Sequence, residues 1–99
     1  MEIVTLSGKV TGICEYRKDK NGNNYVRFRV SCIGKDYSGD VKYTFYRCFC
    51  YDTNFKDLKT GDTVFLCGEL YVSIKDDSSG KPALNCDVYV KCISRGDSS

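Results

Sequence analysis

Apolar and polar residues alternate along most of this chain, and a period of two residues is typical of a half-buried β-strand. Between residues 3 and 14, Val4, Leu6 and Val10 fall on one face and polar residues on the other. Four later runs share this alternation or a β-rich composition. We therefore predict strands over residues 3–14, 25–32, 41–51, 62–72 and 84–93.

Turn residues separate these runs. Asn21-Gly22, within residues 17–24, is the strongest short hairpin signal in the chain, since this pair favours the tight turn between antiparallel strands. Residues 34–40 and 76–82 are polar and contain glycine, which is typical of loops. The first two strands are therefore expected to form a hairpin, and loops are expected to join the second strand to the third and the fourth strand to the fifth.

Residues 53–60 break the alternation and predict a short helix, which Thr53 or Asn54 caps at its start and Gly61 ends. The element order is then three strands, a helix and two strands. This order is the topology of the OB-fold, an all-β, five-stranded Greek-key barrel with one short helix between strands 3 and 4. An open sandwich is the alternative.

The length of 99 residues suits one domain, with residues 1–94 as the barrel and residues 95–99 as a short polar tail. Gly8 and Gly68 lie in the middle of predicted strands, where glycine marks a bulge or a sharp coil. A small closed barrel needs such points.

The charge and hydropathy pattern restricts the partners and the compartment. The formal net charge is only +2, so a protein of this kind binds nucleic acid only if its charge is sorted onto one face. No apolar run approaches the roughly 18 residues of a membrane span, and Glu2 stands where a signal peptide carries basic residues. We therefore expect a cytoplasmic protein with no membrane partner.

The chain has seven cysteines, and their odd number and strand-like spacing argue against a disulfide framework. Cys48 and Cys50 lie two residues apart and so share a strand face. We interpret most of the cysteines as small buried apolar residues. The chain has no histidine and no pair of cysteines spaced for zinc, so we expect no bound metal.

The run 41–51 carries aromatic residues on both faces. Its even positions end in the small residues Cys48 and Cys50, which suit the tight interior of a barrel. The odd positions then point outward and include Tyr43, Phe45, Arg47, Phe49 and Tyr51.

The preceding strand adds Tyr25, Arg27 and Arg29 on its outer face. Exposed rings are unfavourable unless something covers them, and nucleic-acid bases can stack on them while arginine pairs with phosphate. The pattern therefore favours a surface for single-stranded nucleic acid. Such rings also stabilise sheets and are enriched in protein interfaces, so a structural role and a protein partner remain alternatives.

No catalytic set is recognisable. The chain has no histidine base for a cysteine or serine nucleophile and no glycine-rich phosphate loop. Asp76 and Asp77 precede Ser78, Ser79 and Gly80, which is the composition of a solvated turn. We therefore expect a protein that is not an enzyme and needs no cofactor and no small-molecule substrate.

Several motifs occur in the order and spacing of a known family. They are Val4-x-Leu6-x-Gly8-x-Val10, Gly22 followed by Val26-x-Phe28-x-Val30, Phe45-Tyr46-Arg47 in place of a Trp-x-Arg, the aromatic Tyr51, and Leu58-x-x-Gly61-Asp62-x-Val64-x-Leu66-x-Gly68-x-Leu70. Over residues 2–93 the chain resembles the bacterial single-stranded DNA-binding proteins and the related primosomal replication protein, which share the OB-fold.

The resemblance implies that aromatic residues of the third strand stack on bases. Phe45 and Tyr51 would take this role, and Arg47 would contact a phosphate or a base. Tyr37, in the loop after the second strand, lies near another stacking position of the family. Family members form dimers or tetramers through the barrel edge, so the resemblance implies a homo-dimer or homo-tetramer here.

Two departures from the family change the expectation. Where the family has an aromatic residue after the fourth strand, this chain has Ile74-Lys75, so charge replaces one stacking contact. Replicative members end in a long disordered segment with an acidic, phenylalanine-containing tip, whereas this sequence stops shortly after Arg95. The resemblance thus implies a phage, plasmid, accessory or primosome-like protein rather than the main cellular one.

Together these observations predict a protein that binds single-stranded DNA without sequence preference, in replication, recombination or repair, along the second and third strands. The alternatives are a protein-interaction module of a replication or conjugation complex and an RNA-binding OB domain. The predicted nucleic-acid-binding residues are Tyr25, Arg27, Arg29, Tyr37, Tyr43, Phe45, Arg47, Phe49, Tyr51 and Lys75.

Overall fold

Five strands form a closed barrel in the computed structural model, which describes residues 2–35 and 37–96. The elements are β1 (Glu2–Lys18), β2 (Asn24–Lys35), β3 (Val41–Cys50), the 3-10 helix η1 (Thr53–Phe55), β4 (Thr63–Asp76) and β5 (Pro82–Arg95). The strand order around the barrel is β1-β2-β3-β5-β4, with β3 and β5 parallel and the other pairs antiparallel. The predicted OB-fold is confirmed, and closure excludes the open sandwich.

The first strand closes the barrel by changing partner at its midpoint. Its first half pairs with β4 and its second half with β2, and Lys9 takes part in both ladders. A Cβ atom on the neighbouring Gly8 would lie 2.3 Å from the carbonyl oxygen of Ser31, so only glycine fits this approach. The sharp coil expected at Gly8 is therefore present.

A small apolar core fills the barrel. Its most buried members alternate along the strands as the sequence pattern requires. They are Leu6, Val10, Val26, Phe28, Val30, Cys48, Cys50, Leu58, Val64, Leu66 and Val88.

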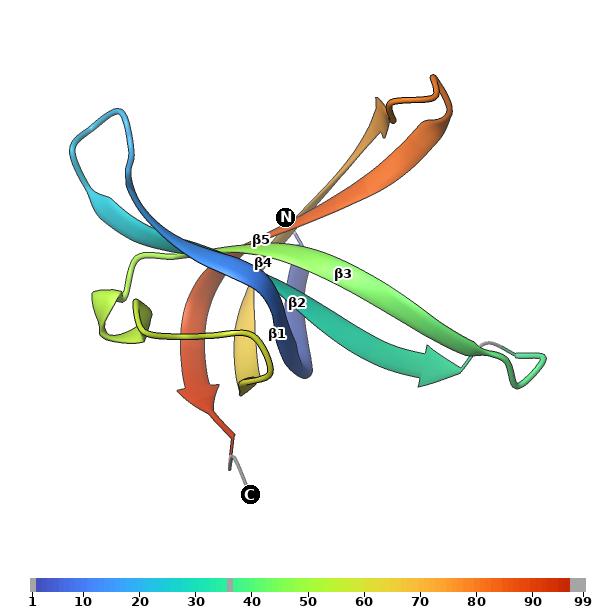
Figure 1. Cartoon of the computed structure of the whole chain (residues 1–99), viewed down its shortest axis with the longest axis horizontal. Helices are drawn as coiled ribbons and strands as arrows, with labels where there is room; N and C mark the ends of the chain where they lie inside the picture. The colour runs from blue at the N-terminus through green and yellow to red at the C-terminus, as the bar shows by residue number, and fades with distance from the viewer. Residues whose placement is uncertain (1, 36, 97–99) are drawn as a thin grey trace.

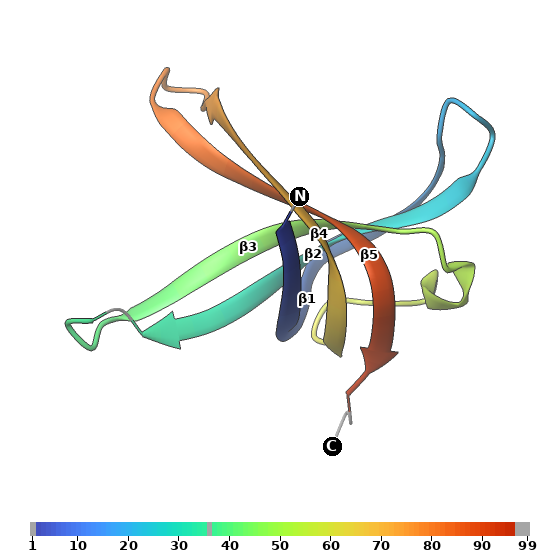
Figure 2. The same ribbon diagram turned by 180° about the vertical axis from the view of Figure 1, so that it is seen from behind.

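Three hairpins project from this barrel in different directions (Figures 1 and 2). They are the ends of β1 and β2, of β2 and β3, and of β4 and β5. Four strands, β1, β2, β4 and β5, are longer than predicted because paired strands continue past the core, where both faces are polar or mixed and the apolar signal fades. The strand β3 ends one residue earlier than predicted, at Cys50. Within the described residues, no helix has the length and apolar character to cross a membrane.

The predicted short helix between the third and fourth strands is present, but it is the 3-10 turn Thr53–Phe55 and does not extend to residue 60. Asp52 caps it, through a side chain that accepts a hydrogen bond from the Asn54 amide at 3.1 Å. The segment that follows is held instead by β1. The Gly61 amide donates to the Val10 carbonyl at 2.9 Å.

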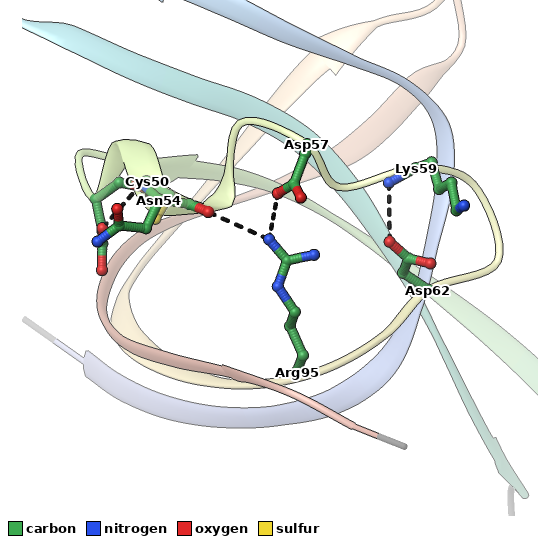
Figure 3. A network of polar contacts seen from close by, with 7 residues as sticks. Cys50, Asn54, Asp57, Lys59, Asp62 and Arg95 are labelled. Carbon is green, nitrogen blue, oxygen red and sulfur yellow. Dashed lines mark hydrogen bonds and ion pairs between the residues drawn. The ribbon is translucent and has the colours of Figure 1, made fainter. Parts of the chain in front are cut away.

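Arg95 contacts the segment that contains η1 at one end of the barrel (Figure 3). Its guanidinium forms an ion pair with Asp57, donates to the Asn54 carbonyl at 3.2 Å and lies 5.1 Å from the Phe55 ring centroid. The strand β5 includes Arg95, which is the first residue of the predicted polar tail, and residues 97–99 of that tail lie outside the described residues.

The strand β5 departs from simple alternation at Cys92. A period of two would place Cys92 on the same face as Val88 and Val90, but Cys92 is exposed. A bulge places Cys67 opposite Cys92 and Gly68 opposite Val90, so the extra residue between them reverses the alternation. Cys67 and Cys92 therefore share the outer face.

The cysteines divide by their place in the barrel. Cys48 and Cys50 are buried as predicted, and burial raises the pKa of the Cys48 thiol to about 12. Cys14 and Cys32 are half-buried and pack against the core, whereas Cys67, Cys86 and Cys92 do not belong to it. The prediction of full burial is therefore confirmed only for Cys48 and Cys50. All seven are free thiols.

Candidate nucleic-acid interface

The outer faces of β2 and β3 carry the predicted aromatic and basic residues. The antiparallel register places Arg27 opposite Phe49 and Arg29 opposite Arg47. Since Cys48 and Cys50 of the same strand are buried, the odd positions of β3 point away from the core, as the sequence pattern indicated.

Three rings predicted from the sequence are in contact on this face. The Tyr25 ring lies between those of Tyr51 and Phe49, with centroid distances of 5.4 Å and 6.0 Å. The Tyr51 hydroxyl donates to an Asp19 carboxylate oxygen at 3.0 Å, which ties the rings to the turn between β1 and β2. Partial burial, together with this acceptor, raises the pKa of Tyr51.

Two further tyrosines, absent from the predicted site, extend the line of rings. Tyr89 of β5 stacks on Phe49 at 5.1 Å, and Tyr71 of β4 meets Tyr89 edge to face at 5.4 Å. We call Tyr51, Tyr25, Phe49, Tyr89 and Tyr71 the ring row. Both missed tyrosines occupy outward positions of their strands, but only the parallel pairing of β3 with β5 brings them to Phe49.

Arg47 lies beside the ring row and is held by an acid. Its Nε and Nη2 atoms each donate to one carboxylate oxygen of Asp87 at 2.9 Å, and its guanidinium carbon lies 5.5 Å from the Phe49 centroid. The bidentate hydrogen bond raises the pKa of Arg47 further. The parallel register of β3 and β5 sets this pair directly opposite.

Arg27 is paired as well, whereas Arg29 is not. The Arg27 guanidinium donates to Glu15 at 2.7 Å, and the hydrogen bonds from Arg27 and Arg17 lower the pKa of that carboxyl. Among the residues that the structure describes, no acid pairs with Arg29. Arg27, Arg29 and Arg47 together line a hollow of about 420 Å³ against the bulged part of β1, which we call the arginine hollow.

Phe45 and Tyr43 lie further along β3, where it forms an arm with β2. Phe45 is 53% exposed and borders a smaller hollow of about 160 Å³ together with Arg29 and Arg47. Tyr43 is exposed opposite Ile33. Both rings share the outer face with the ring row but are not in contact with it.

Two predicted site residues stand apart from this surface. Tyr37 is fully exposed in the loop between β2 and β3, and it makes no ring contact within the described residues. Lys75 lies near the tip of the β4–β5 hairpin, opposite Ala83 and on the same side of β4 as Tyr71. The fold does not bring either residue to the arginine hollow.

Comparison with known proteins gives the family. Residues 1–95 match the single-strand binding protein family. The chain belongs to that family. Its members bind single-stranded DNA, are not enzymes and typically assemble into oligomers, so the sequence-based expectation of a DNA-binding protein without catalytic activity is confirmed.

Solved structures agree on the fold of this family member. A small single-stranded DNA-binding protein from Streptomyces coelicolor is 23% identical, with a TM-score of 0.76 over 96% of this chain and 94% of that one. The SSB of Plasmodium falciparum, in a complex with single-stranded DNA, is 17% identical, with a TM-score of 0.70 over 98% of this chain and 96% of that one. No curated protein matches the sequence significantly.

Proposed function

We propose that this member of the single-strand binding family holds single-stranded DNA on the outer face of β2 and β3, without sequence preference. Bases stack on Tyr25, Phe49 and Tyr51, and phosphates enter the arginine hollow. The observation that carries this proposal is the contact of these three rings beside the three arginines. Base stacking on an aromatic side chain contributes about 1–3 kcal/mol per base and is tolerant of sequence.

Stacking supplies the larger share of the affinity in this proposal. Two of the three arginines in the hollow already have carboxylate partners, so a phosphate must compete for them. Phe45, exposed beside Arg29, gives a further stacking surface toward the β2–β3 hairpin. The predicted contacts from Tyr43, Tyr37 and Lys75 stay part of the proposal as outer contacts along the arms.

The wider role follows from the family. We place the protein in the cytoplasm, acting in DNA replication, recombination or repair as a homo-dimer or homo-tetramer. The family match supports this role, since single-stranded DNA is the shared intermediate of these processes.

The test removes two exposed rings of the predicted site, Tyr51 of the three rings in contact and Phe45 beside Arg29. Phe45→Ala combined with Tyr51→Ala is compared with Tyr16→Ala, whose ring is equally exposed at 52% but lies over Lys56 beside η1. Binding is measured by the fluorescence anisotropy of a labelled oligothymidylate, and folding by circular dichroism. We expect the double variant to bind at least about tenfold more weakly. Equal affinity of the double variant and the control would contradict the assigned face.

A further inference from the structure

The outer face of β4 and β5 continues the aromatic surface beyond the strands that the sequence indicated. Tyr89 and Tyr71 keep 41% and 48% of their surface exposed, although each ring touches a neighbour. A pair that served only to stabilise the sheet would gain more by being covered. Both tyrosines therefore keep surface that a ligand can reach.

The ring row crosses the strands rather than following one of them. Tyr25, Phe49, Tyr89 and Tyr71 come from β2, β3, β5 and β4, which are successive neighbours in the barrel. The centroid spacings of 6.0, 5.1 and 5.4 Å are close to the roughly 4.8 Å between adjacent strands. A chain of bases that begins on Tyr25 and Phe49 thus meets the next ring directly on β5.

The charged side chains on the outer face of β4 and β5 do not repel a polyanion such as DNA. The two acids beside the tyrosines are both paired, Asp87 with Arg47 at 2.9 Å and Glu69 with Lys91 at 3.3 Å. The Tyr71 hydroxyl also donates to Glu69 at 2.9 Å, which raises the pKa of Tyr71 and lowers that of Glu69. The surface is locally neutral, so binding there depends on stacking.

The same residues line a shallow, open hollow. Its volume is about 490 Å³, which is within the usual size of ligand sites. It is lined by Glu69, Tyr71, Asp87, Tyr89 and Lys91.

We propose that Tyr71 and Tyr89 form a second base-stacking subsite, which carries single-stranded DNA from the β2–β3 face onto β5 and β4. This inference rests on the proposed function. The occupant is the same DNA strand, because the Phe49–Tyr89 stack makes the two surfaces one continuous row. A DNA strand that follows the ring row crosses four β-strands of the barrel instead of running along two of them.

The experiment replaces both rings and varies the length of the DNA. In Tyr71→Ile with Tyr89→Ile, the β-branched side chains retain strand propensity but present no flat face to a base. Tyr16→Ile is the matched control. Anisotropy titrations use oligothymidylates that range from a few nucleotides to lengths that exceed the whole row.

We expect the shortest oligonucleotides that bind to show equal affinity for the double variant and the wild-type protein. For long oligonucleotides, the double variant is expected to bind about tenfold more weakly, because the gain in affinity with length is lost. Equal affinity at every length would overturn the subsite and leave the proposed function intact. Equal weakening at every length would also overturn it, since the rings would then act through the structure of the β2–β3 face.

Photocrosslinking of the wild-type protein keeps the inference testable if the variant does not fold. Long oligonucleotides containing 5-iododeoxyuridine are expected to crosslink to peptides that contain Tyr71 or Tyr89. Crosslinks confined to β2 and β3 would overturn the subsite alone. A wild-type protein that binds no oligonucleotide of any length would overturn the proposed function, and the subsite with it.

Discussion

Arg47 shows how a single side chain sets the balance between charge and stacking at this site. Its two hydrogen bonds to Asp87 orient the guanidinium beside Phe49 but also occupy the donors that a phosphate would use. The Arg27–Glu15 pair repeats the arrangement on the other side of Arg29. The face therefore presents fewer available positive charges than its arginines suggest.

Asp87→Asn tests this competition. Removing the carboxylate charge frees Arg47 for phosphate, so we expect tighter binding of single-stranded DNA. The logarithm of the binding constant falls by about 0.7 per tenfold rise in salt for each phosphate contact to a single strand. The slope of a salt titration is thus expected to steepen by about 0.7.

The matched control for this variant is Asp57→Asn, which removes the acid paired with Arg95 at the η1 end of the barrel. It should leave both affinity and salt slope unchanged. An unchanged slope in Asp87→Asn would show that Asp87 does not compete with DNA for Arg47.

At the residue scale, sequence could indicate which side chains point outward but not what they touch. The alternation on β3 separated Phe49 and Arg47 from the buried Cys48, because a strand fixes side-chain direction. The partner of Arg47 is 40 residues away along the chain, and nothing in the pattern marks Asp87. Tyr71 and Tyr89 were missed for the same reason.

At the scale of elements, the strands depend on two glycines at which neighbouring backbones approach closely. A Cβ atom on Gly68 would lie 2.3 Å from the Tyr89 carbonyl oxygen, next to the bulge that turns Cys92 outward. The alternation of apolar and polar residues predicted the strands, and Gly8 and Gly68 predicted the points at which the strands coil sharply. The bulge lies at Gly68, where the sequence predicted a bulge or a sharp coil, but the composition did not indicate that the extra residue in β5 would turn Cys92 outward.

Gly68→Ala is therefore expected to destabilise the fold by about 1–3 kcal/mol, as overpacking forces β4 and β5 apart. Gly34→Ala is the control, since a Cβ atom there meets nothing within 4 Å. It should be neutral or stabilising by up to about 1 kcal/mol. Urea unfolding followed by circular dichroism measures both. Equal stability of the two variants would show that β4 and β5 tolerate the added methyl group.

At the scale of the whole molecule, barrel closure assembles the ring row. Antiparallel neighbours such as β1 and β2 could be paired from the hairpin signal between them, and the order of three strands, a helix and two strands predicted the topology. The parallel contact of β3 with β5 joins Phe49 to Tyr89 across 40 residues of chain, and local sequence signals carry no information about it. Three hairpins project from the closed barrel in different directions (Figure 1).

The central claim is that this surface binds single-stranded DNA by stacking bases on tyrosine and phenylalanine rings. The chain has eight tyrosines and no tryptophan, so its intrinsic fluorescence reports on the rings themselves. The most direct measurement is a titration of the wild-type tyrosine emission with oligothymidylate and, in parallel, with a duplex of equal length. The account predicts saturable quenching by the single strand and little change with the duplex. Equal quenching by both, or tight binding of the single strand with no change in emission, would contradict it.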